Sequence, residues 1–241
     1  MAREFIAWLA QPSGLRWLDV DCGTGALTQT ILEMAAPREV VGVDQSEGYV
    51  AYASERVADP RARFRKADAQ ALPFPNPEFD AAVSGLVLNF VPAQARALGE
   101  MRRAVRRGGA VAVYVWDYAG RMELMRHFWD AAAALDPAAQ ELDEGRRFPI
   151  CKPEPLAELF QQVGLRDIEG RAIDAPTVFR DFDDYWSPFL GGQGPAPAYC
   201  MSLPEDRRAA LRERIRVGLP IRPDGSIPLV ARAWAVRARV P

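Results

Sequence analysis

Histidine and cysteine are scarce in this chain of 241 residues. His127 is the only histidine, and the three cysteines, Cys22, Cys151 and Cys200, are far apart in the sequence. No CxxC pair and no Cys/His cluster occurs, so neither a disulfide framework nor a zinc site is predicted. We therefore expect no metal in the functional site, and a reduced, cytoplasmic compartment.

The sequence also lacks an excess of charge and a long apolar run. Lys and Arg number 30 against 32 Asp and Glu, which leaves a net charge of -2, so we expect no nucleic-acid partner. No apolar run reaches the length of a transmembrane helix, so stable membrane insertion is not expected. Apolar residues make up 49% of the chain, enough for a sizeable core.

Short apolar runs alternate with amphipathic stretches over the first two-thirds of the chain. Continuous apolar strands separated by helices are typical of a parallel sheet that is covered on both faces. The predicted fold class is therefore α/β, a doubly wound, Rossmann-like sheet with ligands at the carboxyl ends of its strands. The predicted strands are Arg16–Cys22, Glu39–Asp44, Arg63–Asp68, Phe79–Val87 and Ala110–Trp116, and the helices between them are Ala26–Ala35, Glu47–Val57 and Ala93–Arg107, the last stopped by Gly108-Gly109.

The last third has a different pattern, with several helical stretches and one final strand. We expect these helices to cap the ligand end of the sheet, within a single domain over residues 1–241 whose cofactor-binding core is about 12–118 and whose cap and C-terminal strands are about 119–241. Oligomeric state is left open. The predicted elements are helices over Met122–Leu135, Pro155–Val163, Asp183–Leu190 and Glu205–Val217, strand-like stretches within Leu165–Phe179, a loop over Gly191–Pro197 and a strand over Ile227–Val240.

The segment Leu18-Asp19-Val20-Asp21-Cys22-Gly23-Thr24-Gly25 carries the clearest functional signal, because it ends a predicted strand and opens a predicted helix. Glycines there let the backbone approach a ligand, and the helix N-terminus offers free N–H donors. The next strand ends in Asp44, nineteen residues after Gly25, where a carboxylate can accept from ribose hydroxyls. The third strand ends in Asp68. Together these residues predict a nucleotide-like ligand.

Two classes of nucleotide site are disfavoured because the sequence lacks their motifs. A dinucleotide fingerprint has a glycine three positions after the second one, but Thr28 stands there. A P-loop is excluded because no Gly-Lys-Ser/Thr follows the turn.

LDVDCGTG resembles motif I of class I methyltransferases, which is usually LDVGCGTG. VVGVDQS is similar to their second motif, KADAQALPFPNPEFDAAVSGLVLNFVP to their third and fourth, and EMRRAVRRGGAVAVYVW to their E-x-x-R-V-L-K-P-G-G segment and fifth strand. The nearest subgroup comprises small-molecule methyltransferases similar to ubiquinone and menaquinone C-methyltransferases. The resemblance covers about residues 15–118. It implies a seven-stranded, mostly parallel sheet of order 3-2-1-4-5-7-6, with Ile227–Val240 antiparallel, and S-adenosylmethionine as cofactor for methyl transfer to a small molecule.

The resemblance also implies roles for individual residues in cofactor binding. Gly23 and Gly25 bring the backbone close to the methionine part of the cofactor, and Asp19 orients that loop and the ammonium. The remaining implied contacts are Asp44 to both ribose hydroxyls with Gln45 beside it, Asp68 to the adenine amino group, the Ala69 N–H to the adenine ring, and Gly85 near the ammonium.

One position departs from the family pattern, because Asp21 stands where motif I has glycine. A side chain there takes up space near the methionine part, and its charge repels the cofactor carboxylate. The alternative is that Asp21 pairs with the ammonium. We expect a net loss of affinity, because a buried charge without a good partner costs on the order of 3 kcal/mol.

The acceptor side carries fewer signals. Methyl transfer from a sulfonium needs mainly proximity and in-line orientation, so no catalytic acid or base is assigned. Candidate acceptor residues are Asn89, Trp116, His127 and, in a loop that could close as a flap, Gln193. Core packing is the favoured interpretation of Trp116 and Phe90. Four further aromatic residues either wall an apolar substrate pocket or form ordinary core, namely Trp129, Tyr185, Trp186 and Phe189.

Two alternatives from other classes stay open on the sequence alone. Asp21 is compatible with a degenerate methyltransferase-fold domain that binds the cofactor weakly or not at all. A nicotinamide-binding oxidoreductase is disfavoured by the missing third glycine and by the absence of a Tyr-x-x-x-Lys pair.

The chain begins with an amphipathic stretch, Met1–Ala10, whose Phe5, Ile6 and Leu9 share one side. No N-cap residue precedes Ala2, unlike a natural helix start. Members of the resembled family usually carry a further segment before this helix that covers the cofactor. We therefore expect that the chain as it starts here lacks such a lid segment.

Overall fold

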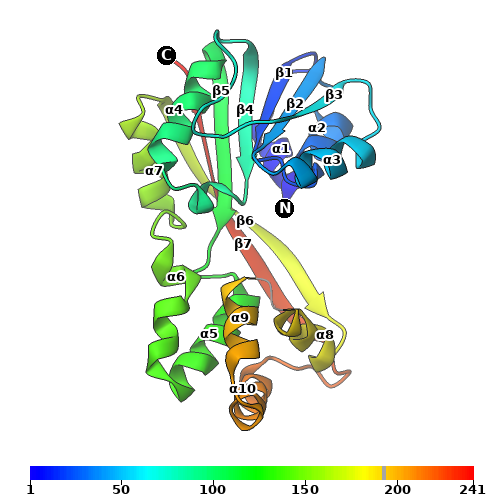
Figure 1. Cartoon of the computed structure of the whole chain (residues 1–241), viewed down its shortest axis with the longest axis vertical. Helices are drawn as coiled ribbons and strands as arrows, with labels where there is room; N and C mark the ends of the chain where they lie inside the picture. Colours follow the sequence, from blue (N-terminus) through cyan, green and yellow to red (C-terminus); the bar gives the residue numbers. More distant parts are fainter. Residues whose placement is uncertain (192–193) are drawn as a thin grey trace. The chain divides into compact units, whose positions relative to one another are not determined.

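The computed structural model describes residues 1–191 and 194–241, and its central feature is a seven-stranded sheet (Figure 1). The order of the strands is β3-β2-β1-β4-β5-β7-β6, which confirms the order that the family resemblance implied. The strands are β1 (Arg16–Val20), β2 (Glu39–Asp44), β3 (Ala62–Lys66), β4 (Phe79–Gly85), β5 (Val105–Trp116), β6 (Arg166–Phe179) and β7 (Ile227–Arg239).

The central strands are parallel and almost wholly apolar. Trp17 of β1 pairs with Val40 of β2 on one side and with Ala81 of β4 on the other. All three residues are fully buried. Strands that are buried on both faces need apolar residues at every position, which is why these segments read as continuous apolar runs in the sequence.

Helices cover this part of the sheet on both faces (Figure 1). The first helix buries Phe5, Ile6 and Leu9, as its amphipathic pattern predicted. Phe5 packs against Tyr114 of β5 with the two rings tilted and their centroids 4.6 Å apart, and so anchors the helix. The helices are α1 (Ala2–Leu9), α2 (Ala26–Met34), α3 (Glu47–Arg56), α4 (Gln94–Ala104) and α7 (Pro153–Gln162).

Strand β7 runs antiparallel to β5. The Gly108 N–H, near the start of β5, donates to the carbonyl of Val240 just after β7, and the Val240 N–H donates back to Gly109. This pairing of one strand's start with the other's end confirms the predicted antiparallel strand.

Contacts within the chain divide it into two compact units, each with its own core. Unit 1 comprises 1–115, 153–173 and 234–241, and unit 2 comprises 116–152 and 174–233. The interpretation of residues 1–241 as a single domain stays a prediction. Unit 2 contains α5 (Glu123–Leu135), η2 (Pro137–Leu142), α6 (Glu144–Arg147), α8 (Phe182–Trp186), η3 (Ser187–Leu190), α9 (Pro195–Ser202) and α10 (Glu205–Gly218), and parts of β6 and β7.

Predicted and observed boundaries differ most clearly in two regions. The helix expected to reach Arg107 ends at Ala104, and β5 already begins at Val105 and continues through the glycine pair. Val105 pairs with Phe79 of β4 and is buried, so sheet pairing overrides the helical pattern. The loop expected over Gly191–Pro197 contains the start of α9, because Pro195 occupies the first helical turn, where proline has no N–H to lose.

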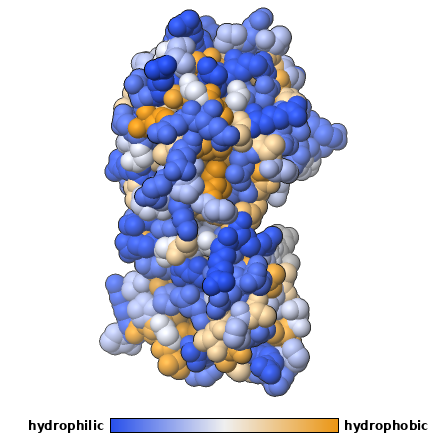
Figure 2. Space-filling view, turned by 90° about the vertical axis from the view of Figure 1, so that its left-hand side faces the viewer, coloured by the Kyte–Doolittle hydropathy of each residue, from blue (hydrophilic) through white to orange (hydrophobic). Residues whose placement is uncertain are grey.

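The face shown in Figure 2 is mostly hydrophilic, with apolar residues in small groups among the polar ones. No helix in the described part of the chain is both long and apolar enough to span a membrane. Within the same residues no group of three or more His, Cys, Asp or Glu is arranged to hold a metal. Cys22, Cys151 and Cys200 are buried free thiols.

The fold generates a prediction from two glycines. A Cβ at Gly109 would lie 2.6 Å from the Asp80 carbonyl and 2.8 Å from the Arg106 carbonyl, whereas a Cβ at Gly99 in α4 would meet nothing within 4 Å. Gly109→Ala should therefore lower the free energy of unfolding by about 1–3 kcal/mol through overpacking. Gly99→Ala should raise it by about 0.5–1 kcal/mol through helix propensity. Equal effects in urea titrations would contradict the described start of β5.

Candidate functional site

The turn between β1 and α2 has three residues in the left-handed region of backbone space. Their φ angles are 54° for Asp21, 53° for Gly23 and 81° for Gly25. Glycine adopts such angles without strain, and aspartate is among the few other residues that visit them. This conformation suits both the glycine of the resembled motif I and the aspartate that stands at position 21 here. Sequence reasoning considered only space and charge at this position and missed the backbone reason.

Asp44, at the end of β2, ties this turn to its neighbouring strand. One carboxylate oxygen accepts from the Gly23 N–H at 3.0 Å, and the other accepts from the Ser46 N–H at 2.8 Å. The side chain is buried. Each oxygen retains a lone pair, so the carboxylate can accept from a ligand hydroxyl as well.

Asp68, which follows β3, is held by Gln70. The backbone and side-chain N–H groups of Gln70 both donate to Asp68 Oδ1, at 2.8 and 3.1 Å. These bonds, the backbone one above all, lower the pKa of Asp68. Gln70 also accepts from the Ala93 N–H at 3.1 Å, so it connects the segment after β3 with the one after β4.

These strand ends surround a cavity of about 540 Å³, a size within the range of small-molecule sites. Six of the nine predicted cofactor residues line it, namely Asp21, Gly23, Asp44, Gln45, Asp68 and Ala69. Phe90, which the sequence analysis considered with core packing favoured, lines it as well. Sequence reasoning missed the remaining lining residues, which are Thr24, Ser46, Tyr49, Gln70, Val87, Val91 and Pro92. Most of them directly follow a predicted residue or a strand end, which is the signal that could have found them.

Phe90 corrects one expectation. Core packing was the favoured interpretation of this side chain, but Phe90 is 55% exposed and lines the cavity. It lies in the short helix η1 (Leu88–Phe90), which leaves β4 at the same edge of the sheet.

Three predicted cofactor residues do not line the cavity. Gly25 packs inward, since a Cβ there would lie 2.9 Å from a Val57 methyl group. Gly85 packs against Tyr114, whose hydroxyl would be 2.6 Å from an added Cβ. Asp19 is fully buried in β1.

Asp19 nevertheless has one carboxylate oxygen that could accept a further hydrogen bond. The Thr28 hydroxyl donates to its Oδ2 at 2.7 Å, while its Oδ1 has no hydrogen-bond partner among the described residues. Burial raises the pKa of Asp19 to about 7, and the charges of Asp21 and Asp44 add to the shift. Thr28 stands where a dinucleotide fingerprint would have glycine, and at this position its hydroxyl supplies a hydrogen bond to Asp19.

The charge of the cavity is negative. Three carboxylates line it, and no Lys or Arg is among the described lining residues. Burial raises the pKa of Asp21 to about 6, with further contributions from the charges of Asp44 and Asp68. A cation or a ligand rich in donors fits such a cavity better than an anion does.

Among the described residues predicted for the acceptor, Asn89 alone belongs to the same unit as the cofactor residues. Asn89 is only 4% exposed, and neither polar atom of its side chain has a partner among the described residues, although its neighbours Val87 and Phe90 line the cavity. Trp116 is half-buried and belongs, with His127, to unit 2. Gln193 and the flap proposed around it lie outside the described residues.

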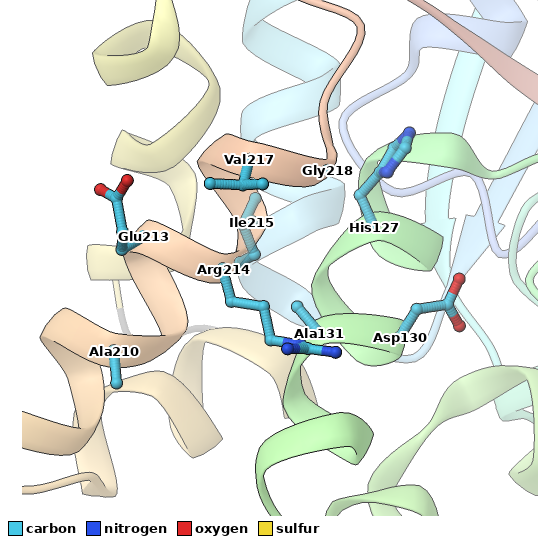
Figure 3. A pocket seen from close by; sticks show the side chains of 9 residues that line it. All are labelled: His127, Asp130, Ala131, Ala210, Glu213, Arg214, Ile215, Val217 and Gly218. Atoms are coloured by element: carbon cyan, nitrogen blue, oxygen red, sulfur yellow. The ribbon is translucent and has the colours of Figure 1, made fainter.

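His127 lies in a separate groove of unit 2, between α5 and α10 (Figure 3). Asp130 and Arg214 contribute charged side chains to the same groove. Burial lowers the pKa of His127, so the imidazole is neutral at physiological pH. The four aromatic residues considered for a substrate pocket are buried within the core of unit 2, which favours the core interpretation for Trp129, Tyr185, Trp186 and Phe189.

Comparisons with known proteins agree with this geometry. Residues 18–113 match the family described as "Methyltransferase domain". A demethylmenaquinone methyltransferase of Roseiflexus castenholzii is 32% identical over 184 residues, which cover 70% of this chain and 75% of the relative. A 2-methyl-6-phytyl-1,4-hydroquinone methyltransferase of Synechocystis is 30% identical over 188 residues, which cover 76% of this chain and 57% of the relative.

The fold has solved counterparts as well. The phosphoethanolamine N-methyltransferase 2 of Haemonchus contortus, in complex with phosphomonomethylethanolamine and S-adenosylhomocysteine, has a TM-score of 0.62 at 17% identity, over all of this chain and 52% of that one. The sheet order and the cavity at its carboxyl edge are those of the class I methyltransferase fold. The chain belongs to the S-adenosylmethionine-dependent methyltransferases of this class, in the group that includes the demethylmenaquinone methyltransferases. It is an enzyme, and its cofactor is S-adenosylmethionine.

The raised pKa of Asp19 yields a prediction about stability. An acid whose pKa is higher in the folded state loses stability as pH rises from its unfolded pKa to its folded one, here from about 4 to about 7. Asp19→Asn can keep the Thr28 hydrogen bond without the buried charge. Its stability relative to the parent should therefore rise between pH 5 and pH 8, by on the order of 2 kcal/mol.

Chemical denaturation at the two pH values measures this difference. The control is Asp206→Asn, at an exposed position in the first turn of α10. Its free energy of unfolding relative to the parent should be the same at pH 5 and at pH 8. A difference for Asp19→Asn that does not change with pH would contradict the assigned pKa.

Proposed function

We propose that this methyltransferase transfers a methyl group to a ring carbon of a prenylated hydroquinone. The observation that carries the proposal is the 32% identity to a demethylmenaquinone methyltransferase over three-quarters of that protein. The similarity to a 2-methyl-6-phytyl-1,4-hydroquinone methyltransferase supports the same substrate class, because one name gives a quinone and the other a phytyl-substituted hydroquinone.

The residues around the cavity fit the cofactor. Asp44 is proposed to accept from both ribose hydroxyls, for which its two oxygens have lone pairs in addition to the bonds from Gly23 and Ser46. Asp68 would accept from the adenine amino group, and Gln70 keeps its carboxylate ionised and oriented. The Ala69 N–H would donate to the adenine ring, with Gln45 beside the ribose.

The methionine part is assigned to the turn after β1. Gly23 would allow close backbone approach there, while Gly25 shapes the turn and the start of α2. Asp19 has an unpartnered buried oxygen that an ammonium group could satisfy, directly or through the turn. Gly85 would keep the neighbouring end of β4 open by accommodating Tyr114.

When bound, S-adenosylmethionine would supply an electrophilic methyl group on a positively charged sulfur. The chain's own contribution is to position the two reactants and exclude water. Asn89 is proposed as an acceptor-binding residue because its buried amide offers both a donor and an acceptor. Trp116, His127 and Gln193 stay candidates for the acceptor.

The two alternatives are not favoured. A nicotinamide site needs a glycine where Thr28 makes a hydrogen bond to Asp19. A degenerate domain would have lost cofactor-binding residues, whereas Asp44, Asp68 and the turn conformation are retained around one cavity.

Cofactor binding is tested through Asp44. S-Adenosylmethionine or its demethylated product should raise the Tm of the parent protein. Asp44→Ala should abolish that rise, because it removes the ribose acceptors and the support of Gly23. Asp206→Ala should leave it unchanged. A rise retained in Asp44→Ala would contradict the assigned site.

Substrate class is tested by supplying short-chain prenylated naphthohydroquinone and benzohydroquinone under reducing conditions. We expect a product heavier by one CH2, with the new methyl group on a ring carbon by NMR, and none with Asp44→Ala. Cofactor binding without turnover of either quinol would mean that the acceptor class is wrong while the cofactor site is right.

A further inference from the structure

Among the described residues that line the cavity, Asp21 is the one carboxylate whose charge is not offset by a hydrogen bond. Asp44 accepts from two backbone N–H groups, and Asp68 accepts twice from Gln70. Asp21 is half-buried, and no described residue donates a hydrogen bond to it. An uncompensated charge in a cavity acts on whichever charges the ligand brings.

The methyl donor and its product differ in one charge. The donor has a sulfonium, an ammonium and a carboxylate, whereas the product has a neutral thioether with the same ammonium and carboxylate. Any effect of Asp21 on the ammonium and carboxylate is therefore common to both ligands. The ratio of the two dissociation constants isolates the effect on the sulfonium.

We propose that Asp21, standing where motif I has glycine, makes this cavity select the positively charged methyl donor over its neutral product. The carboxylate attracts the donor's sulfonium and loses that attraction once the methyl group has been transferred. Product release is thereby favoured at the end of each turnover. The inference rests on the proposed cofactor residues, and it does not depend on which acceptor is methylated.

The size of the cavity sets the strength of this effect. A cavity of 540 Å³ is about 10 Å across, which is comparable to the distance of about 8 Å over which salt screens charges. A sulfonium bound there is therefore within reach of Asp21. At that separation, and with the intermediate dielectric of a partly open site, one charge pair changes an affinity roughly tenfold.

The backbone allows the charge to be removed alone. Asp21 has a φ of 54°, an angle that asparagine also adopts readily. Asp21→Asn thus keeps the shape of the side chain and the turn, and Asp21→Gly restores the residue of the family motif. Glu47→Gln is a matched control, because Glu47 begins α3 near Ser46 but is exposed, pairs with Lys66 and does not line the cavity.

Isothermal titration of S-adenosylmethionine and S-adenosylhomocysteine at pH 7.5 tests the proposal. The ratio of the product's Kd to the donor's Kd should be roughly tenfold larger in the parent than in Asp21→Asn. Asp21→Gly should resemble Asp21→Asn, and Glu47→Gln should resemble the parent. This comparison holds whether Asp21 raises or lowers affinity for both ligands together.

A second binding experiment at pH 5 tests the same side chain in its protonated form. Asp19, Asp44, Asp68 and the Cys22 thiol are the groups that face Asp21, and Asp19 also titrates between these pH values. Because the pKa of Asp21 is about 6, the parent's ratio should fall at pH 5. The ratio should fall less in Asp21→Asn, because in that variant Asp19 still gains a proton but position 21 does not.

The outcomes separate the two proposals. An equal ratio in the parent and Asp21→Asn at pH 7.5 would overturn the role of Asp21 while leaving the cofactor site intact. Failure of the parent to bind either ligand would overturn both. Normal binding and the expected ratio, without turnover of a prenylated hydroquinone, would support Asp21 and reject only the acceptor.

Discussion

The carboxylate of Asp44 connects the two backbone segments on which the site depends. It accepts from Gly23 in the turn after β1 and from Ser46 before α3. Ser46 in turn caps α3 by accepting from the Tyr49 N–H. The end of one strand thus fixes the glycine turn of its neighbour and the start of the following helix. Because all three segments line the cavity, hydrogen bonds to a single side chain fix this part of its wall, while Gln70 connects the segments after β3 and β4.

The left-handed turn places an additional demand on the residue at position 21. Its φ of 54° disfavours most side chains, whereas glycine and aspartate both adopt it and differ in charge. The choice of aspartate adds a carboxylate to a cavity that already contains two. The backbone conformation therefore limits which residues can occupy position 21. Among those residues, the charge can still differ.

Much of this organisation could be predicted from the sequence, and the failures have physical causes. Buried parallel strands are apolar throughout, so Arg16–Val20 and Glu39–Asp44 are visible as runs, and the acids that follow them mark the ligand edge. Phe90 could not be assigned in this way, because an aromatic residue after a strand suits either core or cavity. The start of β5 at Val105 depends on pairing with Phe79, a contact that local pattern does not contain.

Unpartnered polar atoms give independent support for the location of the ligand. Within the described residues, buried side-chain atoms without a hydrogen bond occur in Trp17, Asp19 and Asn89. Each such group costs about 1–3 kcal/mol, which a core of this size tolerates only at a few places. Asp19 is in β1 and Asn89 follows β4, the adjacent strands between which the strand order reverses. Ligands of open α/β sheets bind at that reversal, beyond the carboxyl ends of the strands. Two of the three residues, Asp19 and Asn89, thus lie where a bound ligand could satisfy their unpartnered atoms, whereas Trp17 lies near the start of β1. A ligand that binds there would offset the cost of keeping these two polar groups buried.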